Sequence, residues 1–318
     1  MSDIDYTYFY KNKLDSISEL STNYDFFLSF YSDTERVKTI FENIVSKTKV
    51  WISKELNLVI SPEKHFITQD ELSENDNVYN LLNDLKISST DKLCIDITSF
   101  PIPFLFLLLK NLQFSNILYF DIIYTEPVTY NQKEHTIFSE EFMSVKQIEG
   151  YEGTHNTSDD SNDFLIIASG YDHSRVIDVC KNKSHTRKIQ VFGLPSLQPD
   201  FYQENIIKTE KASEELAHPN FNDFDLNIFA PANDPFVTAQ ELKLFIQRQN
   251  NRKVITNLYL SPLSTKAQAL GFALYYLWEC ENMPVSIIYP FCNGDIHNTS
   301  NGISNISVYN IELPEALI

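Results

Sequence analysis

Several residue types are scarce in this chain of 318 residues, and each scarcity excludes a class of site. Only 7 glycines and 4 cysteines occur. No GxGxxG fingerprint and no P-loop pattern is present, so the sequence predicts no ordinary dinucleotide or triphosphate site. The cysteines stand singly with no CxxC pair, and the 7 histidines form no HExxH pattern, which favours buried thiols over a zinc site. We therefore expect neither a metal nor a cofactor.

Basic residues and long apolar runs are also in short supply. Lysine and arginine total 25 against 43 aspartates and glutamates, so the formal charge is −18 and the field of the protein repels polyanions. A direct contact with duplex nucleic acid is therefore not expected. The longest apolar segment, residues 100–112, is too short to span a bilayer, and the N-terminus lacks the regions of a signal peptide. These features predict a cytoplasmic protein that does not bind membranes.

The chain does contain an internal repeat. Residues 26–44 and 165–183 each read as a short apolar strand, a polar turn, an Arg-Val pair and a helix. Residues 93–112 and 257–277 form a second pair, in which an apolar strand leads through a turn of Ser, Thr and Pro into an apolar helix. The first pair aligns Asp33 and Arg36 with Asp172 and Arg175.

The strands of these repeats are continuously apolar and alternate with helices, which is typical of parallel sheets covered on both faces. The sequence therefore predicts an α/β protein of two tandem Rossmann-like units with mainly parallel sheets and a possible internal duplication. The alternative is that unrelated βαβ units resemble each other because such strands and helices recur. Residues 149–163, rich in Gly, Ser, Asn and Asp, are expected to link an N-terminal unit, 1–148, to a C-terminal unit, 164–318.

Polar turns follow several predicted strands, at the sheet edge where parallel α/β proteins bind ligands. In SGYDHSR, residues 169–175, Gly170 permits close backbone approach, and Arg175 suits an anion. Asp172 is either a helix cap or a ligand contact. His173 and Asp172 are the candidate catalytic groups, since an imidazole titrates near neutral pH. For His173 the alternative is a surface or capping role.

Other turns carry further candidate ligand contacts. Asn233 and Asp234 precede a helix that begins near Pro235, and they serve either as caps or as contacts to a ribose or base edge. Lys266 stands alone between a buried strand and a helix, where it is either a solvated turn residue or a counter-charge for a phosphate. The hydroxyl candidates at strand ends are Thr98, Ser99, Ser264 and Thr265.

The segment LYLSPLSTKAQALGFAL, residues 258–274, resembles the second signature of the CARF and SAVED group of Rossmann-like sensors in prokaryotic defence. In that group a strand ends in a turn of Thr, Ser and Gly that carries a lysine and leads into a helix. CIDITSFPIPFLFLLL, residues 94–109, is similar to the same signature in the other copy, with Pro103 at the place of the lysine. FLIIASGYDHSRV and FFLSFYSDTERV resemble the group's first strand and loop.

The resemblance implies a pocket for a cyclic oligonucleotide or another nucleotide-like second messenger, formed where two Rossmann-like units meet. No nuclease or other effector domain accompanies the two units, so it also implies that a partner protein supplies the output. The ligand contacts that it implies are Tyr171, Asp172, Arg175, Ser264, Thr265 and Lys266, with Asp33, Arg36, Thr98 and Ser99 in the other copy.

Three functions remain open at this point. The leading hypothesis is a cytoplasmic sensor or regulatory subunit that binds a nucleotide-type small ligand and acts through a protein partner, or as a homodimer, in antiviral defence. The second is an enzyme that hydrolyses a nucleotide or phosphorylated metabolite, with His173 or Asp172 as the acid or base. The third is a scaffold subunit of a multiprotein complex that binds no small ligand.

Overall fold

The structure is a computed structural model, and it divides into two compact units. The unit of Phe9–Glu134 and His297–Ile318 is named the seven-stranded unit after its main sheet, and the unit of Met1–Tyr8 and His135–Ile296 is named the six-stranded unit. Tyr171, one of the predicted contacts, lies outside the described residues. The structure describes residues 4–20, 22–54, 64–130, 141–156, 158–170, 172–197, 203, 206–207, 227–293 and 300–316.

The seven-stranded unit alternates strands and helices along the chain. Its strands are β1 (Lys11–Leu14), β2 (Tyr24–Phe30), β3 (Ser46–Ser53), β4 (Lys64–Ile67), β5 (Leu93–Asp96), β6 (Tyr119–Glu126), β7 (Thr129–Tyr130), β14 (Ser300–Asn301) and β15 (Asn305–Glu312). Its helices are η2 (Ile17–Glu19), α1 (Glu35–Asn43), α2 (Glu74–Leu85) and α3 (Ile102–Phe114).

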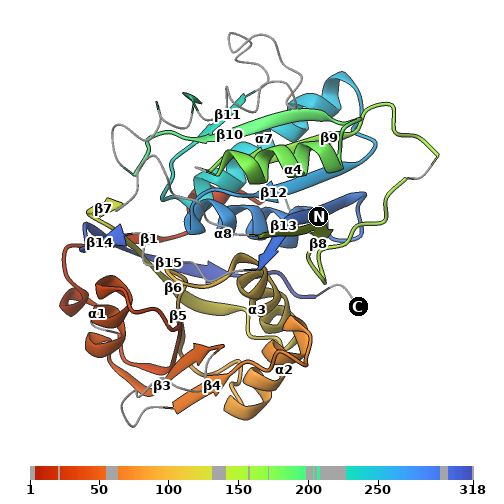
Figure 1. Ribbon diagram of the computed structural model, residues 1–318. Helices are drawn as coiled ribbons and strands as arrows, with labels where there is room; N and C mark the ends of the chain where they lie inside the picture. The colour runs from red at the N-terminus through yellow and green to blue at the C-terminus, as the bar shows by residue number, and fades with distance from the viewer. Residues whose placement is uncertain are drawn as a thin grey trace. The chain divides into compact units, whose positions relative to one another are not determined.

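The sheet of this unit has the strand order β1-β15-β6-β5-β2-β3-β4. Neighbouring strands from β6 to β4 are parallel, whereas β15 runs antiparallel to both β6 and β1. Strands β7 and β14 form a separate two-stranded ladder. Figure 1 shows α1 on one face of the sheet and α2 with α3 on the other. Since helices cover both faces, the central strands must be apolar throughout, as their sequences are.

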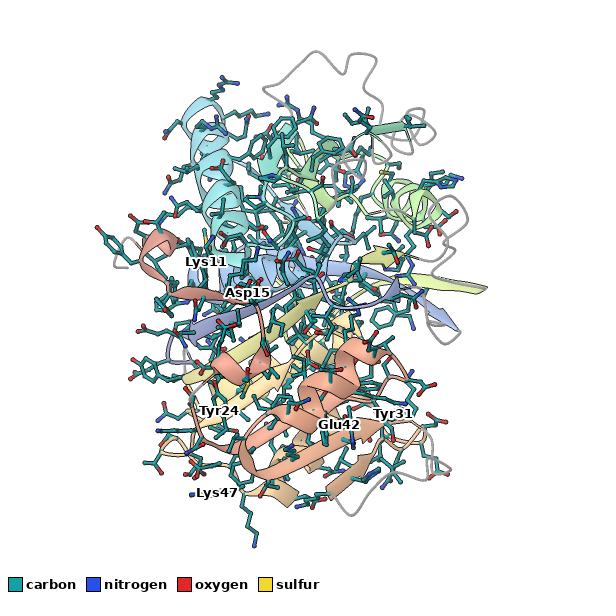
Figure 2. All side chains as sticks on the ribbon, turned by 90° about the vertical axis from the view of Figure 1, so that its left-hand side faces the viewer. Lys11, Asp15, Tyr24, Tyr31, Glu42 and Lys47 are labelled. Atoms are coloured by element: carbon teal, nitrogen blue, oxygen red, sulfur yellow. The ribbon has the colours of Figure 1, made fainter. Side chains whose placement is uncertain are left out.

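The face covered by α1 holds a compact aromatic core. Val37, Ile40 and Phe41 of α1 are buried, and the Phe41 ring stacks on Trp51 of β3 with the centroids 3.6 Å apart. Figure 2 views this face, with labels on Tyr24, the first residue of β2, and Tyr31, the residue after its end. Helix α3 is instead apolar on nearly every side, which explains why almost all of it is buried.

The six-stranded unit repeats this plan. Its strands are β8 (Glu141–Gln147), β9 (Phe164–Ala168), β10 (Arg187–Gly193), β11 (Asn227–Ala230), β12 (Leu258–Pro262) and β13 (Val285–Asn293). Its helices are η1 (Tyr6–Tyr8), α4 (His173–Asn182), α7 (Pro235–Arg252), α8 (Lys266–Tyr275) and the π-helical turn η4 (Tyr276–Cys280).

The sheet order of this unit is β11-β10-β9-β12-β13-β8, parallel except for β8, which is antiparallel to β13. It matches β4-β3-β2-β5-β6-β15 of the other unit in order and direction. The predicted fold class, two Rossmann-like units with mainly parallel sheets, is confirmed, and the shared order supports a duplication. Helices α7 and α8 pack closely, because a Cβ on Gly271 of α8 would lie 2.5 Å from the Pro235 carbonyl oxygen.

The two units exchange their antiparallel strands. Strand β8 follows β6 along the chain but pairs with β13, whereas β15 follows β13 and pairs with β6. The division therefore differs from the predicted boundaries at 148 and 164, because each unit contains a strand from the other half of the sequence. Periodicity along the sequence finds strands, but it does not identify the partners of antiparallel strands such as β8 and β15.

The predicted linker, residues 149–163, also differs from expectation. Its described residues belong to the six-stranded unit. A Cβ on Gly153 would lie 2.1 Å from the Val285 carbonyl oxygen, so this segment runs directly against the start of β13. The Asn257 side chain accepts from the Asn156 N–H at 2.7 Å and donates to the Asn156 carbonyl at 3.1 Å. The polar composition of this segment indicated a loop correctly, but the hydrogen bonds of the buried Asn257 amide hold that loop on the sheet.

In the part of the chain that the structure describes, we find no helix with the length and apolarity needed to cross a membrane.

Candidate functional site

Three loops meet at the carboxyl edge of the six-stranded sheet. The Leu263 N–H after β12 donates to the Ala168 carbonyl of β9 at 3.1 Å. The Thr265 hydroxyl donates to the carbonyl oxygen of Ala232, after β11. Residues 169, 170 and 172, with 231–234 and 263–265, are thus brought together, as open parallel sheets require at this edge. Their role in ligand binding stays a prediction.

Gly170 is at this position because the loops approach each other too closely for a side chain. A Cβ on Gly170 would lie 2.1 Å from the Leu263 carbonyl oxygen and 3.4 Å from Ser264 Cα. Ser264 is half-buried beside it. The glycine therefore serves the packing of the β9–α4 loop on the β12–α8 loop.

Asp172 and Arg175 form a pair within the first turn of α4. The Asp172 carboxylate caps the helix by accepting from the N–H groups of Ser174 and Arg175 at 3.1 and 3.4 Å. Arg175 Nε lies 3.5 Å from Asp172 Oδ2, and Arg175 Nη1 donates to the Tyr289 hydroxyl at 3.0 Å. The guanidinium also lies 5.8 Å from the centre of the Tyr289 ring. Arg175 thus already makes an ion pair, a hydrogen bond and a cation–π contact to residues of its own unit.

Asp234 is the cap of α7. Its carboxylate accepts from the N–H groups of Phe236 and Val237, both at 3.1 Å, and only 1% of the residue is exposed. Pro235 is the first residue of the helix, where its missing N–H leaves no hydrogen bond unmade. Asn233, next to it, is half-buried. Of the two predicted roles of Asp234, helix cap or ligand contact, the geometry supports the helix cap.

Replacing Asp234 tests this capping role. Asp234→Ala is expected to lower the free energy of unfolding by about 1 kcal/mol, because two helix N–H groups lose their acceptor. Chemical denaturation measures the change. Asp234→Asn keeps an acceptor at the cap, so we expect it to stay near wild type. Equal losses in both variants would contradict capping as the source of the effect.

Helix α8 differs from α4 and α7 in having a neutral cap. The Thr265 hydroxyl accepts from the Gln268 N–H at 3.1 Å, and Lys266 is the first helical residue. The N-terminus of α8 therefore combines a hydroxyl cap, the neighbouring Ser264 hydroxyl and a lysine. A helix N-terminus of this composition suits an anion.

His173 begins α4 at the same edge of the sheet and is half-buried. Among the described residues, no hydrogen bond or ion pair links it to an acid or a base. Asp172, the other catalytic candidate, uses its carboxylate as the helix cap. The structure thus brings the two candidates together without the paired geometry of an acid and a base.

Two buried polar atoms near this edge belong to residues that the sequence analysis did not single out. Ser261 Oγ at the end of β12 and Gln268 Oε1 in α8 have no hydrogen-bond partner among the described residues. Both residues are fully buried, and Gln268 Nε2 donates to the Ala230 carbonyl at 3.2 Å. A serine in an apolar strand and a glutamine in an apolar helix are the pattern that could have found them.

The seven-stranded unit assembles its own carboxyl edge from the other predicted residues. The Ser99 hydroxyl donates to the Phe30 carbonyl, and the Thr98 hydroxyl accepts from the Thr125 N–H at 3.0 Å. Arg36 Nη1 donates to the Thr125 carbonyl at 2.9 Å. Three of the predicted residues therefore join the ends of β2, β5 and β6.

Asp33 does not take the place of its counterpart Asp172. Helix α1 begins at Glu35 with Thr34 as its cap residue, so Asp33 lies one position before the cap. Its carboxylate forms an ion pair with Lys38 and is largely exposed. The aligned aspartates thus differ in role because the two helices begin at different positions relative to them.

Asp96 is a buried acid that sequence reasoning missed, although it lies in the DITSF segment read for its hydroxyls. It ends β5, is fully buried, and accepts from the Thr98 N–H at 3.0 Å and the Ser29 hydroxyl at 3.3 Å. Burial raises the pKa of Asp96 to about 6, against the lowering effects of the Thr98 hydrogen bonds, Arg36 and Ser29. A carboxyl group with this pKa changes charge near neutral pH.

A pocket of about 660 Å³ lies at the opposite, amino edge of the six-stranded sheet. His155, one of its lining residues, stacks on Tyr259, and its ring nitrogens contact Ser286 Oγ at 2.9 Å and Asn257 Oδ1 at 3.3 Å. Burial lowers the pKa of His155, which favours the neutral ring. We interpret the role of His155 as structural, because its contacts hold the 149–163 segment against the sheet. The lining residues are Thr154, His155, Asn156, Asp159, Lys253, Val254, Ile255, Thr256 and Pro284.

Within the residues that the structure describes, no group of three or more His, Cys, Asp or Glu side chains is arranged to hold a metal ion.

No protein-family model and no curated protein sequence matches this chain. Among solved structures, a protein titled CobK precorrin-6A reductase is similar at 14% sequence identity and a TM-score of 0.25. The match covers 85% of this chain and 90% of that one. A likeness this distant does not carry activity from one chain to the other.

Proposed function

We propose that the protein is a cytoplasmic sensor or regulatory subunit that binds a nucleotide-type small ligand and acts through a protein partner. Antiviral defence is the setting that the CARF and SAVED resemblance implies. The ligand's phosphate would lie at the N-terminus of α8, on the carboxyl edge of the six-stranded sheet.

The observation that supports this placement is the difference between the three helix caps at that edge. Carboxylates occupy the N-termini of α4 and α7, where Asp172 and Asp234 accept the helix N–H groups. A phosphate there would be repelled by the cap. At α8 the cap is the hydroxyl of Thr265, and Lys266 follows it with a positive charge. Of these three positions, α8 is the one with chemistry suited to a phosphate.

The doubled architecture is consistent with a sensor. Each unit has the Rossmann-like strand order, and the exchanged strands β8 and β15 tie the halves of the chain together. The ligand proposed at α8 would order loops of the six-stranded unit. The edge strand of that unit, β8, comes from the first half of the chain. An output through a partner needs such a connection between site and surface.

Calorimetry against nucleotides and cyclic oligonucleotides tests the proposal. Wild type is expected to bind a member of the panel, and Lys266→Ala is expected to bind it about tenfold more weakly, because a charge-assisted contact is lost. Lys181→Ala is the matched control, since Lys181 is an exposed lysine in the last turn of α4. It should bind like wild type.

The same titration separates the other hypotheses. No binding by wild type, or equal binding by Lys266→Ala and Lys181→Ala, would contradict the proposal. Chromatographic detection of a product, lost in His173→Ala with binding retained, would favour the hydrolase. Absence of binding together with salt-sensitive co-purification of a partner would favour the scaffold, because the chain is strongly acidic.

A further inference from the structure

The N-terminus of α1, in the seven-stranded unit, contains polar atoms whose hydrogen bonds are unmet. Thr34 Oγ1, Arg36 Nε and Thr125 Oγ1 are buried and have no hydrogen-bond partner among the described residues. The three residues are neighbours, since Thr34 is the cap residue of α1 and Arg36 Nη1 donates to the Thr125 carbonyl. Thr34 is 7% exposed and Thr125 is fully buried. Folded proteins rarely leave such a group of atoms unsatisfied.

The six-stranded unit shows what completes the equivalent place. There the Asp172 carboxylate caps α4 and lies 3.5 Å from Arg175 Nε. Among the described residues of the seven-stranded unit no side chain caps α1, although Arg36 aligns with Arg175. One unit thus supplies an oxyanion from its own chain to the helix N-terminus and the arginine, and the other does not.

Nearby carboxylates of the seven-stranded unit are held elsewhere. Asp33 pairs with Lys38 and is exposed. Glu126 accepts from Asn305 Nδ2 at 2.9 Å and is buried at the end of β6. Glu35 is exposed in the first turn of α1 and makes no side-chain cap there. Asp96 is a buried acid at the end of β5 whose ionised form Arg36 favours.

We propose that the N-terminus of α1 binds a small oxyanion, a carboxylate or a phosphate, in the place that Asp172 takes at α4, and that Asp96 takes up a proton when it binds. The donors are the N–H groups of the first turn, the Thr34 and Thr125 hydroxyls and Arg36 Nε. This site is separate from the one proposed at α8 and does not depend on it.

Proton uptake follows from the charges around Asp96. Arg36 on α1 is the cation that favours its ionised form, and the hydrogen bonds come from uncharged groups on Ser29 and Thr98. Cys94, on the same strand, has its pKa raised by burial and by the carboxylates of Asp121 and Asp96, so it is a neutral thiol. An oxyanion on Arg36 neutralises the guanidinium. The Asp96 carboxylate then binds one proton from solvent. The net charge of the site therefore changes by the charge of the oxyanion and by +1 from the proton.

Calorimetry with sodium phosphate and sodium acetate as separate probes tests the site, at constant ionic strength and pH 7. Lys266→Ala protein is used, so that binding at α8 is weakened, and the further loss on adding Arg36→Gln reports on α1. A failure here is then distinct from a failure of the proposed function. Adding Arg36→Gln is expected to weaken binding about tenfold. Lys47→Gln is the matched control, because Lys47 is an exposed lysine at the amino end of β3, away from α1's N-terminus (Figure 2).

Thr34→Asp supplies the missing carboxylate from the chain itself. We expect it to raise the Tm and to abolish oxyanion binding, because its carboxylate would cap α1 as Asp172 caps α4. Binding of acetate and phosphate indicates a site open to carboxylates, and binding of phosphate alone indicates a phosphorylated ligand; either supports the proposal. Binding of neither probe, or equal binding by Arg36→Gln and Lys47→Gln, would overturn it.

Proton uptake is measured by repeating the titration in two buffers of different ionisation enthalpy. The heat should depend on the buffer in the Lys266→Ala protein and should lose that dependence when Asp96→Asn is added. A buffer dependence that persists without the Asp96 carboxyl would overturn the coupling to that residue.

Discussion

Gly170→Ala is expected to lower the free energy of unfolding by about 2 kcal/mol and the Tm by several degrees. The added Cβ would lie 2.1 Å from the Leu263 carbonyl oxygen, which belongs to backbone held by the Leu263 N–H bond to Ala168. A clash with a backbone atom cannot be relieved by turning a side chain. The β9–α4 and β12–α8 loops must therefore move apart, and the residues of the candidate site are then no longer held together.

Gly193→Ala is the matched control for this prediction. Gly193 ends β10 at the same edge, but a Cβ there meets the Ala232 methyl at 3.0 Å rather than a carbonyl. A shift of a few tenths of an ångström relieves that contact, so we expect a loss below about 1 kcal/mol. Chemical denaturation of both variants measures the difference. A loss in Gly193→Ala as large as in Gly170→Ala would refute the importance of the loop contact.

Asp96→Asn is expected to stabilise the protein at pH 7 by up to about 3 kcal/mol, because the ionised carboxylate is buried. The folded-state pKa of about 6 lies above the ordinary 3.8, so the folded protein binds more protons than the unfolded chain between these values. Stability from this group is therefore full below pH 3.8 and falls as the pH rises toward 6. Above that it stays at the lower level.

Unfolding free energies from pH 4 to pH 7.5 measure this effect. The difference between Asp96→Asn and wild type should widen from pH 4 to about pH 6 and then level off. Asn keeps an oxygen acceptor for the Thr98 N–H, and its amide nitrogen can donate to the Ser29 hydroxyl oxygen, which loses its acceptor. Asp84→Asn, an exposed position on α2, should follow wild type throughout. A constant difference across the pH range would show that ionisation of Asp96 is not its source.

Much of the fold could be predicted, because strands buried on both faces require continuous apolar runs and the turns after them require polar caps. The pairing of residues 26–44 with 165–183 identified β2 with β9 and α1 with α4, which occupy the same places in their sheets. The partners of β8 and β15 could not be predicted, since both are ordinary strands. Which strand each of them pairs with is decided by tertiary structure.

The candidate site was predicted in position more than in detail. Topology places Gly170, Ser264 and Thr265 at one edge without any motif. The helix start, by contrast, shifts by one residue between α1 and α4, so the aligned Asp33 and Asp172 have different roles. The burial of Asp96 depends on three strands and a helix at once. No local pattern reveals it.

The exchange of β8 and β15 has a consequence for biosynthesis. Strand β6 is translated long before β15, its antiparallel neighbour, and the whole of the six-stranded unit's parallel sheet lies between them in the sequence. On the ribosome, the edge of β6 therefore stays open until β15 emerges, and an open apolar edge invites pairing with other chains. Such long-range pairing also slows folding. The nascent protein is thus exposed to mispairing along β6 until residues 305–312 have been made.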